Sequence, residues 1–254
     1  MDSVVQQDRV NMTEAEWQVR CDLAALYRIC DMYGWTDTIN THLSVRIPGE
    51  PKCFLINNYG DLFSEVTASS LVKMDLDGKV YSKDGRFNAA GFTIHSGVYK
   101  AREDANCVMH THTRAGGGVS LMKKGIRPIS QDALAVYDDL VYHEYGVPTS
   151  QEECDALGVS CQKGNHVVLL NHGLLSVGAT IPGAFRSIYM MERACELELI
   201  SRQLGEEPVM IEDYIIARAA QRMKQVRSEP TYGQHYFSAL QRQLEKKGVS
   251  DWRQ

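Results

Sequence analysis

Three histidines carry the clearest chemistry in this sequence. His110 and His112 lie two apart at the end of an apolar stretch, and His172 ends a second apolar stretch that begins at His166. Side chains two residues apart in a strand leave the same face. Two strands of one sheet that both end in histidine can therefore bring three imidazole nitrogens to one point. Three protein ligands with an open position is how catalytic metal sites are built, so we predict a metal site at His110, His112 and His172.

The alternative interpretation is that these histidines are scattered core or surface residues. An isolated pair of histidines two apart is more often of that kind. The second strand, with its own terminal histidine, favours a metal site over this alternative.

Composition excludes several classes of protein. The chain has 254 residues and a formal net charge of −5, with no basic stripe, which argues against a nucleic-acid binder. Its apolar runs are far shorter than a membrane span, and its first residues lack the pattern of a signal peptide. The seven cysteines show no CxxC spacing. We therefore expect a cytoplasmic protein with free thiols and no membrane partner.

The periodicity of apolar residues predicts alternating helices and strands. Residues 1–12 read as a loose polar tail, and a capping box at Thr13 opens a helix that extends to about residue 33. A hairpin is expected around Asp77-Gly78. The pattern does not assign residues 126–145 clearly to helices or strands. Further strands are expected at 42–46, 53–56, 106–109 and 166–170, and further helices at 92–102, 150–157, 181–204, 211–227 and 235–247. We expect one domain over 13–205 and a helical C-terminal extension over 206–254.

Four stretches together resemble the class II aldolase/adducin family, and within it the adducin head-domain branch. They are Phe63–Lys73, Ala90–His95, His110–Gly116 and Leu169–Leu175, within a resemblance that spans roughly residues 18–205. The resemblance implies an α/β fold, three-layer α/β/α with a mixed, mostly antiparallel central sheet. It also implies a homotetramer with active sites near subunit contacts. It implies zinc on His110, His112 and His172. By their chemistry, three histidines with open positions can also hold Fe(II) or Mn.

The sequence departs from the sugar-phosphate aldolases of that family where they carry chemistry. The family's acid/base glutamate falls at Gly91, and the serines that help to hold phosphate fall at Ala89 and Ala90. Further phosphate-loop positions fall at Thr41-His42 and Tyr59-Gly60. A phosphate site needs convergent donors, so we expect a non-phosphorylated substrate. We also expect Gly91 to leave room beside the metal for a water or a substrate carboxylate.

Another group must then carry the proton that the glutamate would have carried. His42, Tyr142 and His143 are the candidates for a catalytic acid or base, with Tyr137 and Glu144 as further candidates. The alternative for each is a structural hydrogen bond. His95 lies in the middle of a predicted helix on its apolar stripe, which indicates a core or supporting role.

Two classes of function remain open. The first is a metal-dependent lyase that cleaves a C–C bond, by retro-aldol reaction or decarboxylation, in a small keto or hydroxy acid; a non-heme Fe(II) oxygenase is a variant on the same site. Decarboxylation needs no base, so it tolerates the missing glutamate. The second is a non-catalytic, adducin-like interaction module. All three ligands are present and no lysine-rich tail follows, which favours the enzyme. The aromatic segment Tyr232–Phe237 is expected to close a neighbouring subunit's pocket.

Overall fold

The structure is a computed structural model, and it describes residues 12–254. The expected polar tail therefore lies almost wholly outside the described residues. The helices of the described part are α2 (Glu14–Met32), α3 (Ala89–Ala101), α4 (Arg114–Ser120), α5 (Gln131–Leu134), α6 (Gln151–Cys161), α7 (Ile181–Gln203), α8 (Asp213–Arg227) and α9 (Gln234–Lys246), with short 3-10 turns η1 (Tyr137–Asp139) and η2 (Asp251–Arg253).

One seven-stranded sheet organises the fold, in the order β3-β2-β1-β4-β7-β6-β5. All neighbouring pairs are antiparallel except β5 and β6, which are parallel. The prediction of a mixed, mostly antiparallel sheet is confirmed. Its strands are β1 (His42–Ile47), β2 (Glu50–Ile56), β3 (Val72–Asp75), β4 (Cys107–Thr111), β5 (Leu140–His143), β6 (His166–Leu169) and β7 (Gly173–Gly178).

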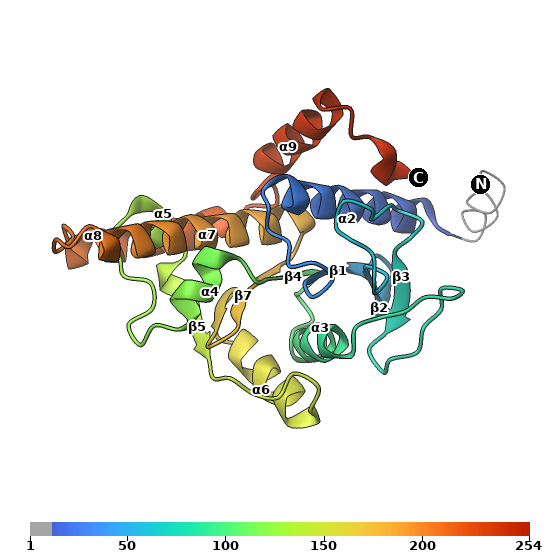
Figure 1. Ribbon diagram of the computed structural model, residues 1–254, viewed down its shortest axis with the longest axis horizontal. Coiled ribbons are helices and arrows are strands. Elements are labelled where there is room, and N and C mark those ends of the chain that lie inside the picture. The colour runs from blue at the N-terminus through green and yellow to red at the C-terminus, as the bar shows by residue number, and fades with distance from the viewer. Residues whose placement is uncertain (1–11) are drawn as a thin grey trace.

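Helices cover both faces of this sheet, which gives three layers (Figure 1). The long helices α2 and α7 lie on one face, and α3 and α6 lie on the other. Each face has its own cluster of buried apolar side chains, so two separate cores hold the layers together. Burial of apolar surface on both faces is the main stabilising term of such a sandwich.

Strand β1 is fully buried but alternates in chemistry. Leu43, Val45 and Ile47 belong to the core beneath α2 and α7. Because side chains alternate along a strand, His42, Ser44 and Arg46 face the α3 side. The sheet register pairs His42 with His110 of β4. A polar stripe of β1 is thereby directed at α3 and at the predicted metal site.

The structure adds detail to two local stretches. The expected hairpin around Asp77-Gly78 is present, but its second arm is a single antiparallel bridge, from Val80 to Met74 of β3. The undecided stretch 126–145 contains β5, which pairs in parallel with β6 at the edge of the sheet. An edge strand with only Leu140–His143 is too short to show a clear alternation in sequence.

The C-terminal segment folds back onto the domain. Phe237 and Leu244 of α9 and Trp252 of η2 are buried in the same core as α2 and α7. The carbonyl of Trp252 accepts a hydrogen bond from the Ala68 amide at 2.7 Å, and Asp251 pairs with Arg28 at 2.9 Å. Phe237 is thus used inside its own subunit. Contact of Tyr232–Phe237 with a neighbouring pocket stays a prediction.

None of the helices in residues 12–254 combines the length and the apolar character that crossing a membrane requires.

The burial of Trp252 gives a test of this C-terminal packing. We expect Trp252→Ala to lower the free energy of unfolding by about 3–5 kcal/mol, the usual cost of removing a large buried ring. Tyr214→Ala is the matched control, because that ring is 62% exposed and its loss should change stability little. Chemical denaturation followed by fluorescence measures both. Equal, small effects for the two variants would contradict the packing.

Candidate metal centre

The three predicted ligands come together at one end of the sheet. His110 belongs to β4, and His112 follows the last residue of that strand. His172 lies in the tight turn between β6 and β7, where Asn171 has a positive φ of 59°. That turn places His172 beside the end of β4, because β7 pairs with β4.

Their ring nitrogens converge closely. Nε2 of His112 lies 2.8 Å from Nε2 of His110 and 2.9 Å from Nε2 of His172. His110 is buried, and the other two are half-buried. All three ligand atoms lie within 4.8 Å of one another, so one ion can contact all three.

The remaining ring contacts fix which nitrogens carry protons. Nδ1–H of His110 donates to the Leu174 carbonyl at 3.0 Å, and Nδ1–H of His112 donates to Asp37 at 2.9 Å. A neutral imidazole with a proton on Nδ1 has a lone pair on Nε2. The Nε2 atoms of His110 and His112 are therefore two hydrogen-bond acceptors 2.8 Å apart, and a cation bound to both removes the repulsion between their lone pairs. These nitrogens are suitable ligands for a divalent metal, and Asp37 is the supporting carboxylate that metal-binding histidines usually have.

Electrostatics also favours neutral ligands. Burial, reinforced by the neighbouring imidazoles, lowers the pKa of His110 well below its ordinary value. Burial likewise lowers the pKa of His172 to about 4. Both rings are therefore neutral at pH 7, which is the state that binds a metal.

A buried acid supports the cluster from the α7 side. The hydroxyl of Thr113 donates to the carboxylate of Glu192 and also caps α4 by accepting from the Gly116 amide at 3.0 Å. Burial raises the pKa of Glu192 to about 7. The cap fixes the backbone immediately after His112, so α4 begins where the ligand strand ends.

His42, one of the predicted proton carriers, lies next to the cluster. Its ring is tilted against that of His110, with centroids 5.1 Å apart. Nδ1 of His42 lies 2.8 Å from Nε2 of His95, the mid-helix histidine of α3. Both rings are buried, and burial lowers the pKa of each, that of His95 to about 3. His95 therefore has the supporting role that its position indicated.

The space beside Gly91 is filled, which corrects the expectation of open room there. A Cβ atom at Gly91 would lie 2.7 Å from Cδ2 and 3.0 Å from Nε2 of His42. The imidazole of His42 thus occupies the room that a side chain at residue 91 would need. Sequence alone could not show this, because it depends on how closely α3 approaches β1.

His143 and Tyr142 have other partners. The ring of His143 contacts Ser160 at 2.8 Å and Glu153 at 3.1 Å, both on α6. The hydroxyl of Tyr142 accepts from the Ile126 amide at 2.8 Å. In the described chain these are the hydrogen bonds of the two side chains, and neither leads to the three-histidine cluster. Their catalytic role stays a prediction.

Two residues near the cluster were missed by sequence reasoning. Asp37 lies in the irregular loop between α2 and β1, where nothing in the spacing marks it as a partner of His112. The ring of Tyr145 lies 6.4 Å from that of His172 and is 59% exposed. Its place after the short strand β5 is the signal that could have indicated it.

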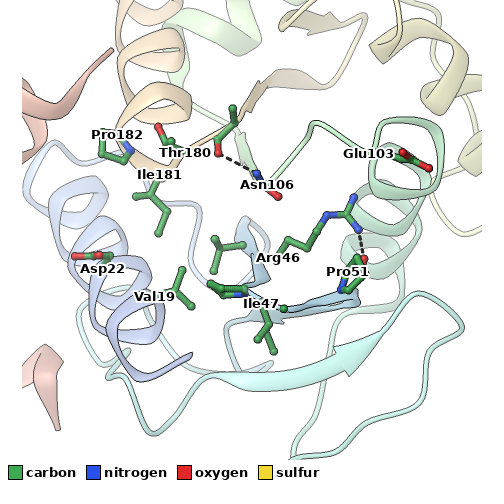
Figure 2. Close-up of a pocket in the computed structure, with 14 residues that line it drawn as sticks. Val19, Asp22, Arg46, Ile47, Pro51, Glu103, Asn106, Thr180, Ile181 and Pro182 are labelled. Carbon is green, nitrogen blue, oxygen red and sulfur yellow. Dashed lines mark hydrogen bonds between the residues drawn. The ribbon is translucent and has the colours of Figure 1, made fainter. Parts of the chain in front are cut away.

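A separate cavity of about 460 Å³ lies at the opposite end of β1, lined by Arg46 and the start of α7 (Figure 2). The guanidinium of Arg46 is already occupied by backbone carbonyls of Tyr99 and Ala105, both at 3.0 Å. This cavity is distinct from the metal centre.

The filled space at Gly91 makes a prediction. Gly91→Ala should lower the free energy of unfolding by about 1–3 kcal/mol, because the new methyl group forces the His42 ring to move. Gly117→Ala is the matched control, since a Cβ there meets nothing within 4 Å and helix propensity then favours alanine by about 1 kcal/mol. Thermal and chemical denaturation measure both. A stabilised Gly91→Ala variant would show that the ring leaves this space open.

Similar proteins are consistent with this geometry. A "Putative aldolase class 2 protein" of Caulobacter vibrioides is 46% identical over 202 residues, which is 79% of each chain. Mouse alpha-adducin is 43% identical over 197 residues, 76% of this chain but only 27% of adducin. A solved aldolase II superfamily protein from Pseudomonas syringae has a TM-score of 0.92 at 37% identity, covering 98% of this chain and 100% of that one.

A solved L-fuculose 1-phosphate aldolase from Glaciozyma antarctica has a TM-score of 0.83 at 28% identity, covering 95% of this chain and 93% of that one. The family model of the class II aldolase and adducin N-terminal domain matches residues 21–199, which include all three clustered histidines. With that match and these relatives, the chain belongs to the class II aldolase and adducin family.

Proposed function

We propose that this protein is a divalent-metal-dependent lyase that cleaves a C–C bond in a small, non-phosphorylated keto or hydroxy acid. The observation that carries the proposal is the convergence of three imidazole Nε2 atoms, with the protons of His110 and His112 held on Nδ1. Zinc is the metal we expect, because three histidine nitrogens with an open position suit it.

When bound, the metal supplies a Lewis acid that polarises a substrate carbonyl and stabilises negative charge left by C–C cleavage. The protein's own groups prepare that site. The Leu174 carbonyl and Asp37 orient the rings of His110 and His112, and His42 lies beside them as the nearest candidate to hold or move a proton. Burial of His42 and His110 excludes water from one side of the cluster.

The start of α3 supports a substrate without phosphate. Ala89, Ala90 and Gly91 offer no side-chain donors, and the first backbone amides of this helix are already capped by Asn88. A phosphate needs several convergent donors. The likeness to L-fuculose 1-phosphate aldolase therefore supports the chemistry of C–C cleavage more than the substrate.

A non-catalytic interaction module is the second candidate, supported by the similarity to alpha-adducin. The two candidates differ in what the histidines must do. A module has no need of three nitrogens aimed at one point, whereas a lyase does.

We also propose a cytoplasmic homotetramer. All seven cysteines are free thiols, as expected in a reducing compartment. Tyr145 is 59% exposed beside His172 and gives a neighbouring subunit an apolar contact next to the site.

Metal content tests the centre directly. His110→Ala, His112→Ala and His172→Ala should each lose bound metal, because two imidazoles make an incomplete site. Asp37→Asn should weaken metal affinity by roughly 10- to 100-fold through loss of its support for His112. The control is His235→Ala, an exposed histidine on α9. Elemental analysis of protein purified without added metal measures all five; stoichiometric metal in every variant would contradict the site.

Turnover under nitrogen tests the reaction. Metal-loaded protein should release a C–C cleavage product from members of a panel of keto and hydroxy acids without oxygen, and chelation should abolish this. L-Fuculose 1-phosphate should be cleaved far more slowly than the best acid. Strict dependence on oxygen would indicate an oxygenase instead. Bound metal with no turnover of any acid would favour the interaction module.

A further inference from the structure

A chain of four buried polar side chains begins at His42 and runs away from the metal centre. His42 Nδ1 lies 2.8 Å from His95 Nε2, and His95 Nδ1 is hydrogen-bonded to the Ser44 hydroxyl. The Ser44 hydroxyl lies 2.7 Å from that of Tyr99. None of the four side chains is more than 3% exposed. The protons between these groups must therefore find their acceptors within the chain, and only the outer nitrogen of His42 lies beyond it.

The need for an acceptor at every buried O–H and N–H selects one donor-to-acceptor direction for these hydrogen bonds. Among the described residues, Ser44 is the hydrogen-bond partner of the Tyr99 hydroxyl, so the Tyr99 O–H is satisfied only when it donates to Ser44. Ser44 then donates to His95 Nδ1, and His95 Nε2–H donates to His42 Nδ1. The reverse direction leaves the buried Tyr99 O–H without an acceptor, which is costly.

The consequence falls on the other nitrogen of His42. A neutral imidazole that accepts at Nδ1 carries its proton on Nε2. In residues 12–254, His42 Nε2 has no hydrogen-bond partner. It is not fully buried, so it keeps some contact with solvent. It is the accessible edge of an otherwise buried ring. The Cδ2–Nε2 edge of the ring lies against Gly91, where a side chain at residue 91 would displace it.

We infer that His42 is a specificity-determining residue that presents Nε2–H as a fixed donor to a carboxylate oxygen of the substrate. The inference rests on the proposed function and names the substrate group that this site recognises. His42 pairs with His110 across β1 and β4, and their rings are 5.1 Å apart, so an acid that reaches the three-histidine cluster also reaches this edge.

A carboxylate suits this donor better than the alternatives. Hydrogen bonds to an ionised acceptor are about twice as strong as those between neutral groups. A single N–H satisfies one carboxylate oxygen, whereas a phosphate requires several donors. A substrate hydroxyl that must donate gains nothing, because Nε2 has no lone pair. Sugar-phosphate aldolases of the family have a glutamate that accepts a proton at the position of Gly91. Here the neighbouring His42 presents an N–H donor instead.

Neutron diffraction tests the direction of the chain without any variant. Crystals of the zinc-loaded protein grown in D₂O should show deuterium on Nε2 of His42 and on Nε2 of His95, with none on either Nδ1. Deuterium on Nδ1 of His42 alone among its ring nitrogens would overturn the inference. This result is independent of whether any acid is cleaved.

Binding tests the ligand group, with pyruvate as the probe and hydroxyacetone as the matched probe that keeps the ketone but lacks the carboxylate. His42→Leu should weaken pyruvate binding by roughly 10- to 100-fold, the range for a hydrogen bond to a charged group. Hydroxyacetone binding should change far less. His42→Gln retains an N–H donor and should recover most of the pyruvate affinity.

Ser44→Ala tests the positioning role of the middle of the chain. Without the Ser44 hydroxyl, His95 Nδ1 has no partner and the Tyr99 O–H has no acceptor in either direction, so deuterium should divide between the two nitrogens of His42 and pyruvate affinity should fall by roughly twofold. Zinc content, measured for every variant, separates the proposed lyase function from the proposed role of His42. Failure of the parent protein to bind zinc would refute the lyase. Full zinc content with equal pyruvate affinity in the parent protein and His42→Leu would refute the role of His42 alone.

Discussion

The crowding of three imidazole nitrogens at one point is the constraint on which the rest of this structure depends. The Nε2 lone pairs of His110 and His112 lie 2.8 Å apart, with the protons of both rings already donated to a carbonyl and a carboxylate, so they repel one another unless a cation contacts both. The fold supplies the rigidity that holds them there. His110 is fixed within a strand, and His172 sits in a two-strand turn paired with that strand through β7.

The sequence carried the ligand set because the ligands follow local rules. His110 and His112 share a face through the strand period, and both histidine strands end in polar residues, so the cluster was predictable from spacing. The mixed sheet followed from family resemblance. What could not be predicted were contacts between elements distant in sequence. Asp37 reaches His112 from a loop 75 residues away, and His42 meets Gly91 only because α3 packs onto β1.

The correction at Gly91 shows why absent side chains are hard to interpret from sequence. A glycine in place of a glutamate suggests a hole, but close-packed interiors rarely leave one. Here the ring of His42 enters from the facing strand, and its partner His95 lies one helical turn beyond Gly91. The edge strand β5 was missed for a related reason: it is short, and its pairing with β6 rather than its own pattern defines it.

The packing of α3 along β1 also restricts insertions and deletions within these two elements. Gly91, His95 and Tyr99 recur every four residues and meet His42, Ser44 and Arg46, which recur every two. Four helical residues advance about 6.0 Å, and two strand residues advance about 6.6 Å. The two repeats therefore stay in step over three contacts. Inserting one residue in either element would rotate or flip every later side chain at once, whereas a substitution disturbs only the contact at which it occurs.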